Sequence, residues 1–118
     1  MKITSVDTNW ANVYVGLKES YDGVIHLQQE AVDICRDYAN KVGLGLTVSG
    51  TLFIYTGGGE PGVVVGLINY PRFPSTTNDI YTHAKAIAEI CMEQFKQERI
   101  SIVMKNKTVM IEREDDGN

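Results

Sequence analysis

Cysteine and positive charge are both scarce in this chain. It has two cysteines, Cys35 and Cys91, and 11 Lys and Arg residues against 15 Asp and Glu, so its formal net charge is -4. Each cysteine falls on the apolar stripe of a predicted helix, which favours a small buried hydrophobe over a disulfide or metal ligand. The basic residues are scattered along the sequence, which argues against long nucleic acid as a partner. A small phosphorylated ligand needs only two or three local donors and stays compatible with this composition.

Long apolar runs are also missing. No stretch reaches 18 consecutive apolar residues, and Met1 to Val6 lack the apolar region of a signal peptide, so we expect no membrane partner and a cytoplasmic location, the host cytoplasm if the protein is viral. With 118 residues, 43% of them apolar, the composition is typical of one globular domain, expected over 1–113 with a disordered acidic tail at 114–118. Such a domain buries about two-thirds of its unfolded surface, so burial in a homo-oligomer would add stability.

No complete catalytic motif is present. The glycines at 57–59 are not followed by Lys and Ser or Thr at a helix start, so they predict a hairpin turn and not a phosphate loop. His26 and His83 lie on different predicted helices without further metal-spaced ligands, which favours solvated pairs with Glu30 and Asp79. We therefore expect no metal and no cofactor, and we favour binding over catalysis. One catalytic alternative stays open: two carboxylates that are distant in the sequence could converge in space and act as general acid and general base.

Hydrophobic periodicity predicts the elements of the first part of the chain. Alternation favours strands, and apolar spacings of three and four favour a helix that Gly43 terminates. The expected elements are strands at Lys2–Val6 and Asn12–Leu17, a helix at Val24–Val42, and strands at Leu46–Thr56 and Val63–Tyr70 joined by a turn at 57–62.

The second part of the chain is predicted in the same way. Thr76 and Asp79 form a capping box for a second helix that we expect to end near Arg99, with one apolar stripe: Ile80, Ala84, Ile87, Ala88, Cys91 and Phe95. A hairpin of Ile100–Met104 and Thr108–Glu112 should turn at Asn106, which tolerates positive φ.

These elements predict an α+β fold in β-β-α-β-β-α-β-β order. Its architecture should be a two-layer sandwich, with two helices on one face of a mostly antiparallel sheet. The other face, with apolar residues such as Val13, Val15, Phe53 and Val64, would then need subunits to stack on it.

One segment suggests a ligand site: Tyr70-Pro71-Arg72-Phe73-Pro74, followed by the start of the second helix. Two prolines should hold Arg72 and Phe73 extended, while the first helical amides, at Thr77 and Asn78, suit a phosphate or carboxylate that Arg72 could clamp. Phe73 or Tyr70 could stack on a base.

Simpler interpretations stay open for each of these residues. Phe73 could be a hydrophobic staple on the helix and Arg72 a solvated side chain. Trp10 could offer a stacking face or close one end of the core. Arg99 and Arg113 could add positive charge to the pocket or lie at the surface.

The run Thr56-Gly57-Gly58-Gly59-Glu60-Pro61-Gly62, with the following strand, helix and Arg99–Glu112 hairpin, resembles the tautomerase superfamily of macrophage migration inhibitory factor-like proteins. The resemblance implies a similar fold and a trimer. Those proteins use an N-terminal proline as catalytic base, whereas Lys2 follows Met1 here, so the catalytic chemistry does not carry over.

A second resemblance lies in the Asn9-Trp10 and Asn69-Tyr70-Pro71-Arg72-Phe73-Pro74 segments. These are similar to viral anti-Thoeris sponge proteins, which form oligomers and sequester cyclic ADP-ribose signals without cleaving them. The leading hypothesis is therefore a non-enzymatic homo-oligomer that binds a nucleotide-like anion. The alternatives are a tautomerase-like enzyme with altered chemistry and a protein-interaction module that uses the exposed sheet face.

Overall fold

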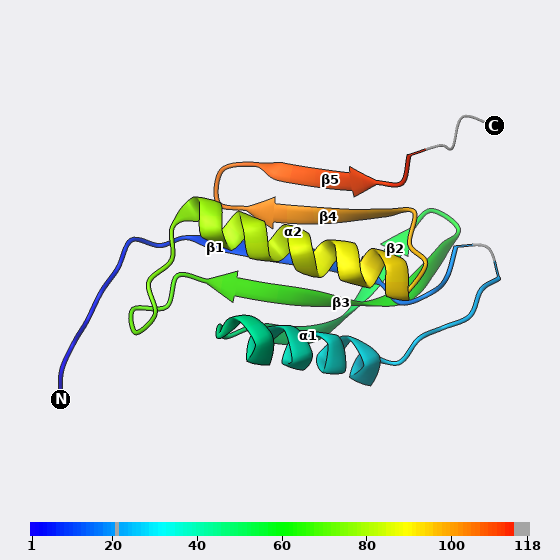
Figure 1. Ribbon diagram of the computed structural model, residues 1–118. Helices are drawn as coiled ribbons and strands as arrows, with labels where there is room; N and C mark the ends of the chain where they lie inside the picture. Colours follow the sequence, from blue (N-terminus) through cyan, green and yellow to red (C-terminus); the bar gives the residue numbers. More distant parts are fainter. Residues whose placement is uncertain (21, 115–118) are drawn as a thin grey trace.

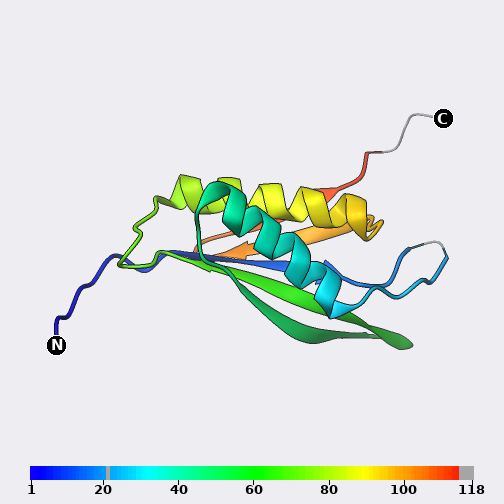
Figure 2. The ribbon, with the colours of Figure 1, turned by 60° about the horizontal axis from the view of Figure 1, so that its bottom comes forward.

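A computed structural model describes residues 1–20 and 22–114. It contains five strands and two helices: β1 (Trp10–Gly16), α1 (Gln28–Val42), β2 (Thr47–Tyr55), β3 (Gly58–Ile68), α2 (Thr77–Gln94), β4 (Arg99–Met104) and β5 (Thr108–Glu112). The strands form one sheet in the order β2-β3-β1-β4-β5, and every neighbouring pair is antiparallel. Both helices cover one face of this sheet (Figures 1 and 2), as the sequence predicted.

The core lies between the helices and the central strands. Val13 and Val15 of β1 and Val63 and Val65 of β3 are fully buried, and all six predicted stripe residues of α2 are buried with them. β3 pairs with β2 on one side and β1 on the other, so it is an inner strand of the sheet. We expected Val13 and Val15 on the uncovered face of the sheet, and this is wrong because both are buried on the helix side. Strand alternation places Trp10, Asn12 and Tyr14 on the uncovered face instead.

The start of α1 is a second correction. The segment from Val24 to Leu27 is extended, because Val24 donates its amide to Asp22 and Ile25 forms a bridge with Lys18. The helix begins only after Leu27, whose amide donates to the Glu30 carboxylate at 2.7 Å. Local hydrogen bonds thus make the helix begin about one turn later than its apolar periodicity predicts. Gly43 closes the helix in the left-handed conformation, at φ 74°, as predicted.

Three other predicted boundaries differ from the structure. No strand forms at Lys2–Val6, since this arm projects beyond the sheet (Figure 1). The turn between β2 and β3 is only Thr56-Gly57, so residues 58–62 belong to β3 and the expected six-residue turn is wrong. α2 ends at Gln94, and Arg99 already begins β4.

The hairpin of β4 and β5 forms where the sequence predicted it. Asn106 does not have positive φ, whereas Lys96, in the link from α2 to β4, does at 50°. Residues 115–118 of the predicted acidic tail lie outside the described residues. Among the described residues, neither helix combines the length and apolar character that crossing a membrane requires.

Candidate functional site

The proline-flanked link between β3 and α2 forms one wall of a cavity of about 450 Å³. Tyr70, Arg72 and Phe73 all line it, together with Ile80 and His83 of α2 and the segment that follows α1. A volume of this size lies within the usual range for small-molecule pockets, roughly 300 to 1,000 Å³. The structure therefore brings together three of the residues that sequence reasoning had grouped.

The link itself is a turn and not the extended segment that we predicted. The amide of Phe73 donates to the carbonyl of Tyr70 at 2.9 Å, which closes a four-residue turn with Pro71 at its second position. Proline at that position presets φ, so the turn still restricts Arg72 and Phe73. The prolines thus fix this corner by a different geometry from the one expected.

Arg72 and Phe73 lie together at the surface. The guanidinium carbon of Arg72 is 5.5 Å from the centre of the Phe73 ring, within cation–π range, and the Phe73 side chain is 63% exposed. This exposure excludes a buried hydrophobic staple. A cation stacked beside an exposed ring can contact a phosphate and a base of the same ligand.

The opposite wall of the cavity contains two features that sequence reasoning missed. Gly43 and Gly45 line it, and the Tyr70 ring lies within van der Waals distance of the side-chain position at Gly45. His83 hydrogen-bonds through Nδ1 to the hydroxyl of Tyr38 at 2.7 Å, and not to Asp79 as expected. Only the folded structure reveals this pair, because Tyr38 and His83 are 45 positions apart in the sequence.

The start of α2 opens onto a neighbouring cavity of about 530 Å³, which is lined by Thr77, Asn9, Asn69 and Lys105. Ser75 lines both cavities, so they meet at the link. The Thr77 hydroxyl accepts from Asn9 at 2.7 Å. The predicted capping box is confirmed, and it places the Asp79 carboxylate 3.3 Å from the Thr76 amide. This carboxylate already interacts with the positive end of the helix, which weakens the attraction of a second anion to Thr77 and Asn78.

The remaining predicted site residues lie elsewhere. Trp10 shares the uncovered sheet face with Tyr14. Arg99 pairs with Glu112 at 3.1 Å. Arg113 closes the far end of α2, where it donates to the carbonyls of Met92 and Gln97, both at 2.9 Å. These three residues are not brought to the cavity beside Arg72.

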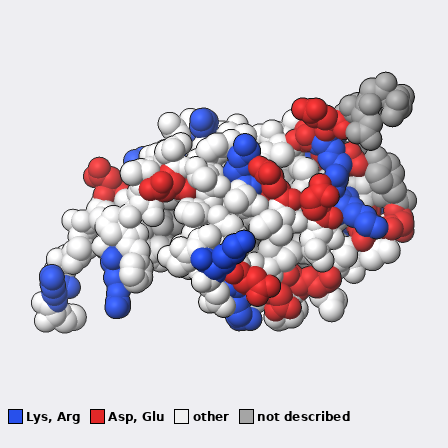
Figure 3. Space-filling view, in the orientation of Figure 1, with Lys and Arg blue, Asp and Glu red and all other residues white. Residues whose placement is uncertain are grey.

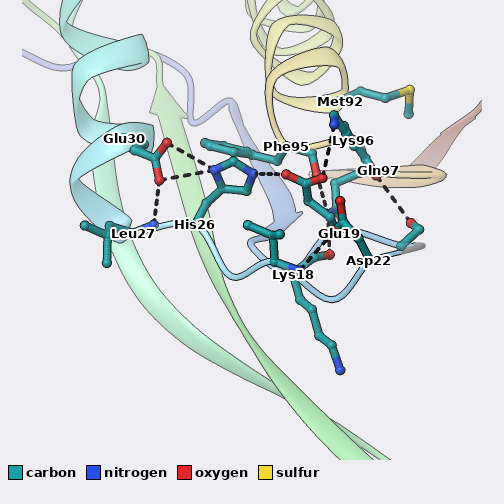
Figure 4. A network of polar contacts seen from close by, with 12 residues as sticks. Lys18, Glu19, Asp22, His26, Leu27, Glu30, Met92, Phe95, Lys96 and Gln97 are labelled. Atoms are coloured by element: carbon teal, nitrogen blue, oxygen red, sulfur yellow. Dashed lines mark hydrogen bonds and ion pairs between the residues drawn. The ribbon is translucent and has the colours of Figure 1, made fainter.

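A titratable cluster, shown in Figure 4, is formed by Glu19, His26, Glu30 and Lys96. None of these residues lines either cavity. The His26 ring lies between two carboxylates, with Nε2 2.6 Å from Glu19 and Nδ1 3.1 Å from Glu30. Lys96 lies 3.4 Å from the other oxygen of Glu19. Burial by itself lowers the pKa of His26, but the hydrogen bonds to Glu30 and Glu19 outweigh it and raise the pKa above its usual value.

This cluster fastens the segment before α1 to the end of α2. The His26 ring also packs against Phe95, with the ring centres 5.0 Å apart. Within residues 1–20 and 22–114, no group of three His, Cys, Asp or Glu side chains is arranged so that it could hold a metal ion. The pair expected at His26 and Glu30 does form, but the His26 side chain is only 14% exposed and is not solvated as predicted.

Charge is not segregated on the helix-covered side of the molecule. Lys and Arg alternate with Asp and Glu across this surface (Figure 3). Such a mixed surface lacks the continuous basic stripe by which proteins hold long nucleic acid.

Solved structures share this arrangement of elements. The chain has the fold of a phage SAM lyase. The lyase in complex with S-methyl-5'-thioadenosine superposes with a TM-score of 0.76 at 16% identity, covering 96% of this chain and 95% of that chain. A phage SAM lyase in the apo state gives a TM-score of 0.73 at 18% identity, covering 90% of each chain. No family model matches the sequence, and no curated protein does.

Proposed function

We propose that this protein binds a small nucleoside-like ligand in the cavity lined by Tyr70, Arg72 and Phe73. The observation that carries the proposal is the exposed Arg72–Phe73 pair on the wall of a cavity of about 450 Å³. The guanidinium would hold a phosphate or carboxylate, and the ring would stack on the base. The shared fold supports this ligand class, since the lyase of that fold binds a nucleoside thioether.

The finer form of the proposal is sequestration. The protein would hold a nucleotide signal of the cyclic ADP-ribose type without changing it, as a viral anti-defence sponge does. Support comes from the phage origin of the protein that shares the fold and from the resemblance of the Asn69–Pro74 segment. Retention without turnover would leave the ligand unavailable to its receptor in the host.

The second candidate is an enzyme. A protein that shares this fold is a SAM lyase, so the same scaffold can carry chemistry on an adenosyl substrate. Fold alone does not transfer activity between proteins. Turnover of the bound compound separates the two candidates.

The proposal is tested by equilibrium dialysis followed by recovery. Cyclic ADP-ribose, S-methyl-5'-thioadenosine and S-adenosylmethionine are each incubated with the protein, which is then heated to release what it holds. Sequestration predicts enrichment on the protein side and release of the unchanged compound. A chemically altered product would establish the enzyme instead, and no enrichment of any of the three would contradict the proposal.

We also propose that the protein is a homo-oligomer that covers its open sheet face. Val64 and Tyr14 lie opposite each other at the centre of this face, and Met110 on β5 is 55% exposed. Burial of such apolar surface is worth about 25 cal/mol for each Å². A second copy of the chain is the occupant that this proposal names.

A further inference from the structure

A second cavity, of about 410 Å³, lies at the Gly16 end of the open sheet face, beside the area around Val64 that the proposed subunit contact covers, and the proposed nucleoside ligand does not use it. It is found near the end of β1 at Gly16, whereas the Arg72 cavity lies near the other end of that strand, where Trp10 pairs with Ile68. Its lining includes Tyr14, Phe53, Glu60, Gln97, Arg99 and Ser101. The two cavities can therefore be tested independently.

Two glycines keep this second cavity open. A side-chain carbon at Gly16 would lie 2.5 Å from Oε1 of Gln97 and 3.3 Å from Oε1 of Glu60. A side-chain carbon at Gly62 would overlap the Phe53 ring, which lies directly over the backbone there. Any larger residue at either position would displace a side chain that lines the cavity.

Gln97 presents a fixed acceptor beside Gly16. The side chain is 7% exposed, and its amide nitrogen donates to the carbonyls of Lys18 at 2.7 Å and Phe95 at 3.0 Å (Figure 4). Both N–H groups of the amide are used, so its oxygen cannot exchange places with its nitrogen. Oε1 of Gln97 is thus held beside Gly16 as an acceptor.

Glu60 brings negative charge to the same point. It lies opposite Phe53 in the β2–β3 pair and is half-buried, and no ion pair forms to it within residues 1–20 and 22–114. Arg99, the cation of the lining, is paired with Glu112. A half-buried carboxylate and an acceptor amide without a dedicated donor favour a ligand that donates hydrogen bonds and carries positive charge.

We propose that this cavity binds the ammonium group of a small organic amine. The ammonium would donate to Oε1 of Gln97 and to the carboxylate of Glu60. The rings of Tyr14 and Phe53 would contact the apolar body of the amine and attract its charge. An anion is disfavoured, because both groups beside Gly16 are acceptors.

Calorimetric titration of the full chain tests this proposal, with phenethylamine as the probe and its neutral analogue 2-phenylethanol as the matched ligand. We expect the amine to bind and the alcohol to bind at least about tenfold more weakly, since it lacks the charge-assisted hydrogen bonds. Equal affinity for both, or no binding of phenethylamine, would overturn the proposal.

Variants locate the site. Glu60→Gln should weaken phenethylamine binding about tenfold or more, and Gly16→Ala should weaken it by filling the cavity, with circular dichroism confirming that each variant folds. Glu89→Gln removes the same charge from the exposed surface of α2, and Arg72→Ala alters the other cavity, so both should retain the affinity. Unchanged binding by Glu60→Gln would overturn the assignment, whatever the outcome for nucleosides.

Discussion

Individual side chains join the segment before α1 to the end of α2. His26 is nearly buried between Glu19 and Glu30, and its pKa is raised in the folded protein. A group whose folded pKa is raised contributes stability that is fully present below its unfolded pKa of about 6.5 and is lost as the pH rises through the folded pKa. The contribution of His26 therefore decreases in the alkaline direction.

We predict that His26→Gln lowers the free energy of unfolding by about 1 to 3 kcal/mol at pH 6, as expected for lost hydrogen bonds to charged groups. The difference from the wild type should shrink as the pH rises to 9. Urea unfolding at a series of pH values measures this, and Gln29→Ala, on the exposed side of the same helix, is the control. A difference that is constant with pH would contradict the charged state of His26.

The two thiols give a second prediction at this scale. Burial raises the pKa of Cys35 to about 11, and burial together with the nearby Cys35 raises that of Cys91 to about 12. Both thiols are protonated at neutral pH, and a protonated thiol is a poor nucleophile. Labelling by an aromatic disulfide reagent should be slow in the native protein and complete within minutes in denaturant; rapid labelling in the native state would disprove their burial.

At the scale of the element, the sequence identified the residues that cap the start of α2. Thr76 caps the helix, with its hydroxyl accepting from the Asp79 amide at 3.1 Å. We predict that Thr76→Ala lowers the free energy of unfolding by about 1 kcal/mol, whereas Thr76→Ser retains most of it because the hydroxyl is kept. Thermal and urea unfolding of the two variants measure the contrast, and equal stability of both would show that the cap is not used.

The strands and helices were predictable where one face of an element is buried continuously. The α2 stripe and the β4–β5 hairpin agree with their periodicity because each packs along its full length. The prediction failed where local hydrogen bonds replaced that pattern, as at Asp22 and Val24, or where glycines extended a strand, as at 58–62. Lys2–Val6 has the composition of a strand but no partner strand within the described chain.

The candidate site was predictable only within one short segment. Tyr70, Arg72 and Phe73 lie within four residues, and the sequence could group them through the flanking prolines. His83, Gly45 and Lys105 come from other elements, so their proximity depends on the fold. For the same reason Trp10, Arg99 and Arg113, grouped by chemistry alone, lie at other places on the molecule.

At the scale of the whole molecule, the uncovered face of the sheet is the surface on which we propose that a second copy of the chain packs. Val64 lies at its centre, opposite Tyr14, and its side chain points away from the helices, since Val63 and Val65 point toward them. We predict that Val64→Lys leaves the subunit folded but dissociates the oligomer, because like charges would meet across the interface. Native mass spectrometry reports the subunit number, and Thr82→Lys, on the exposed face of α2, is the control. A monomeric wild type would contradict the proposed interface.

The central claim is that the corner formed by Tyr70, Arg72 and Phe73 receives a nucleoside-like ligand. The most direct test is calorimetric titration of cyclic ADP-ribose and S-methyl-5'-thioadenosine into the wild type, Arg72→Ala and the surface control Arg36→Ala. We predict that Arg72→Ala weakens binding of the phosphorylated ligand by about 1.5 to 3 kcal/mol, roughly 10- to 150-fold, while Arg36→Ala leaves it unchanged. Equal affinities of the wild type and Arg72→Ala, with both proteins folded, would contradict the claim.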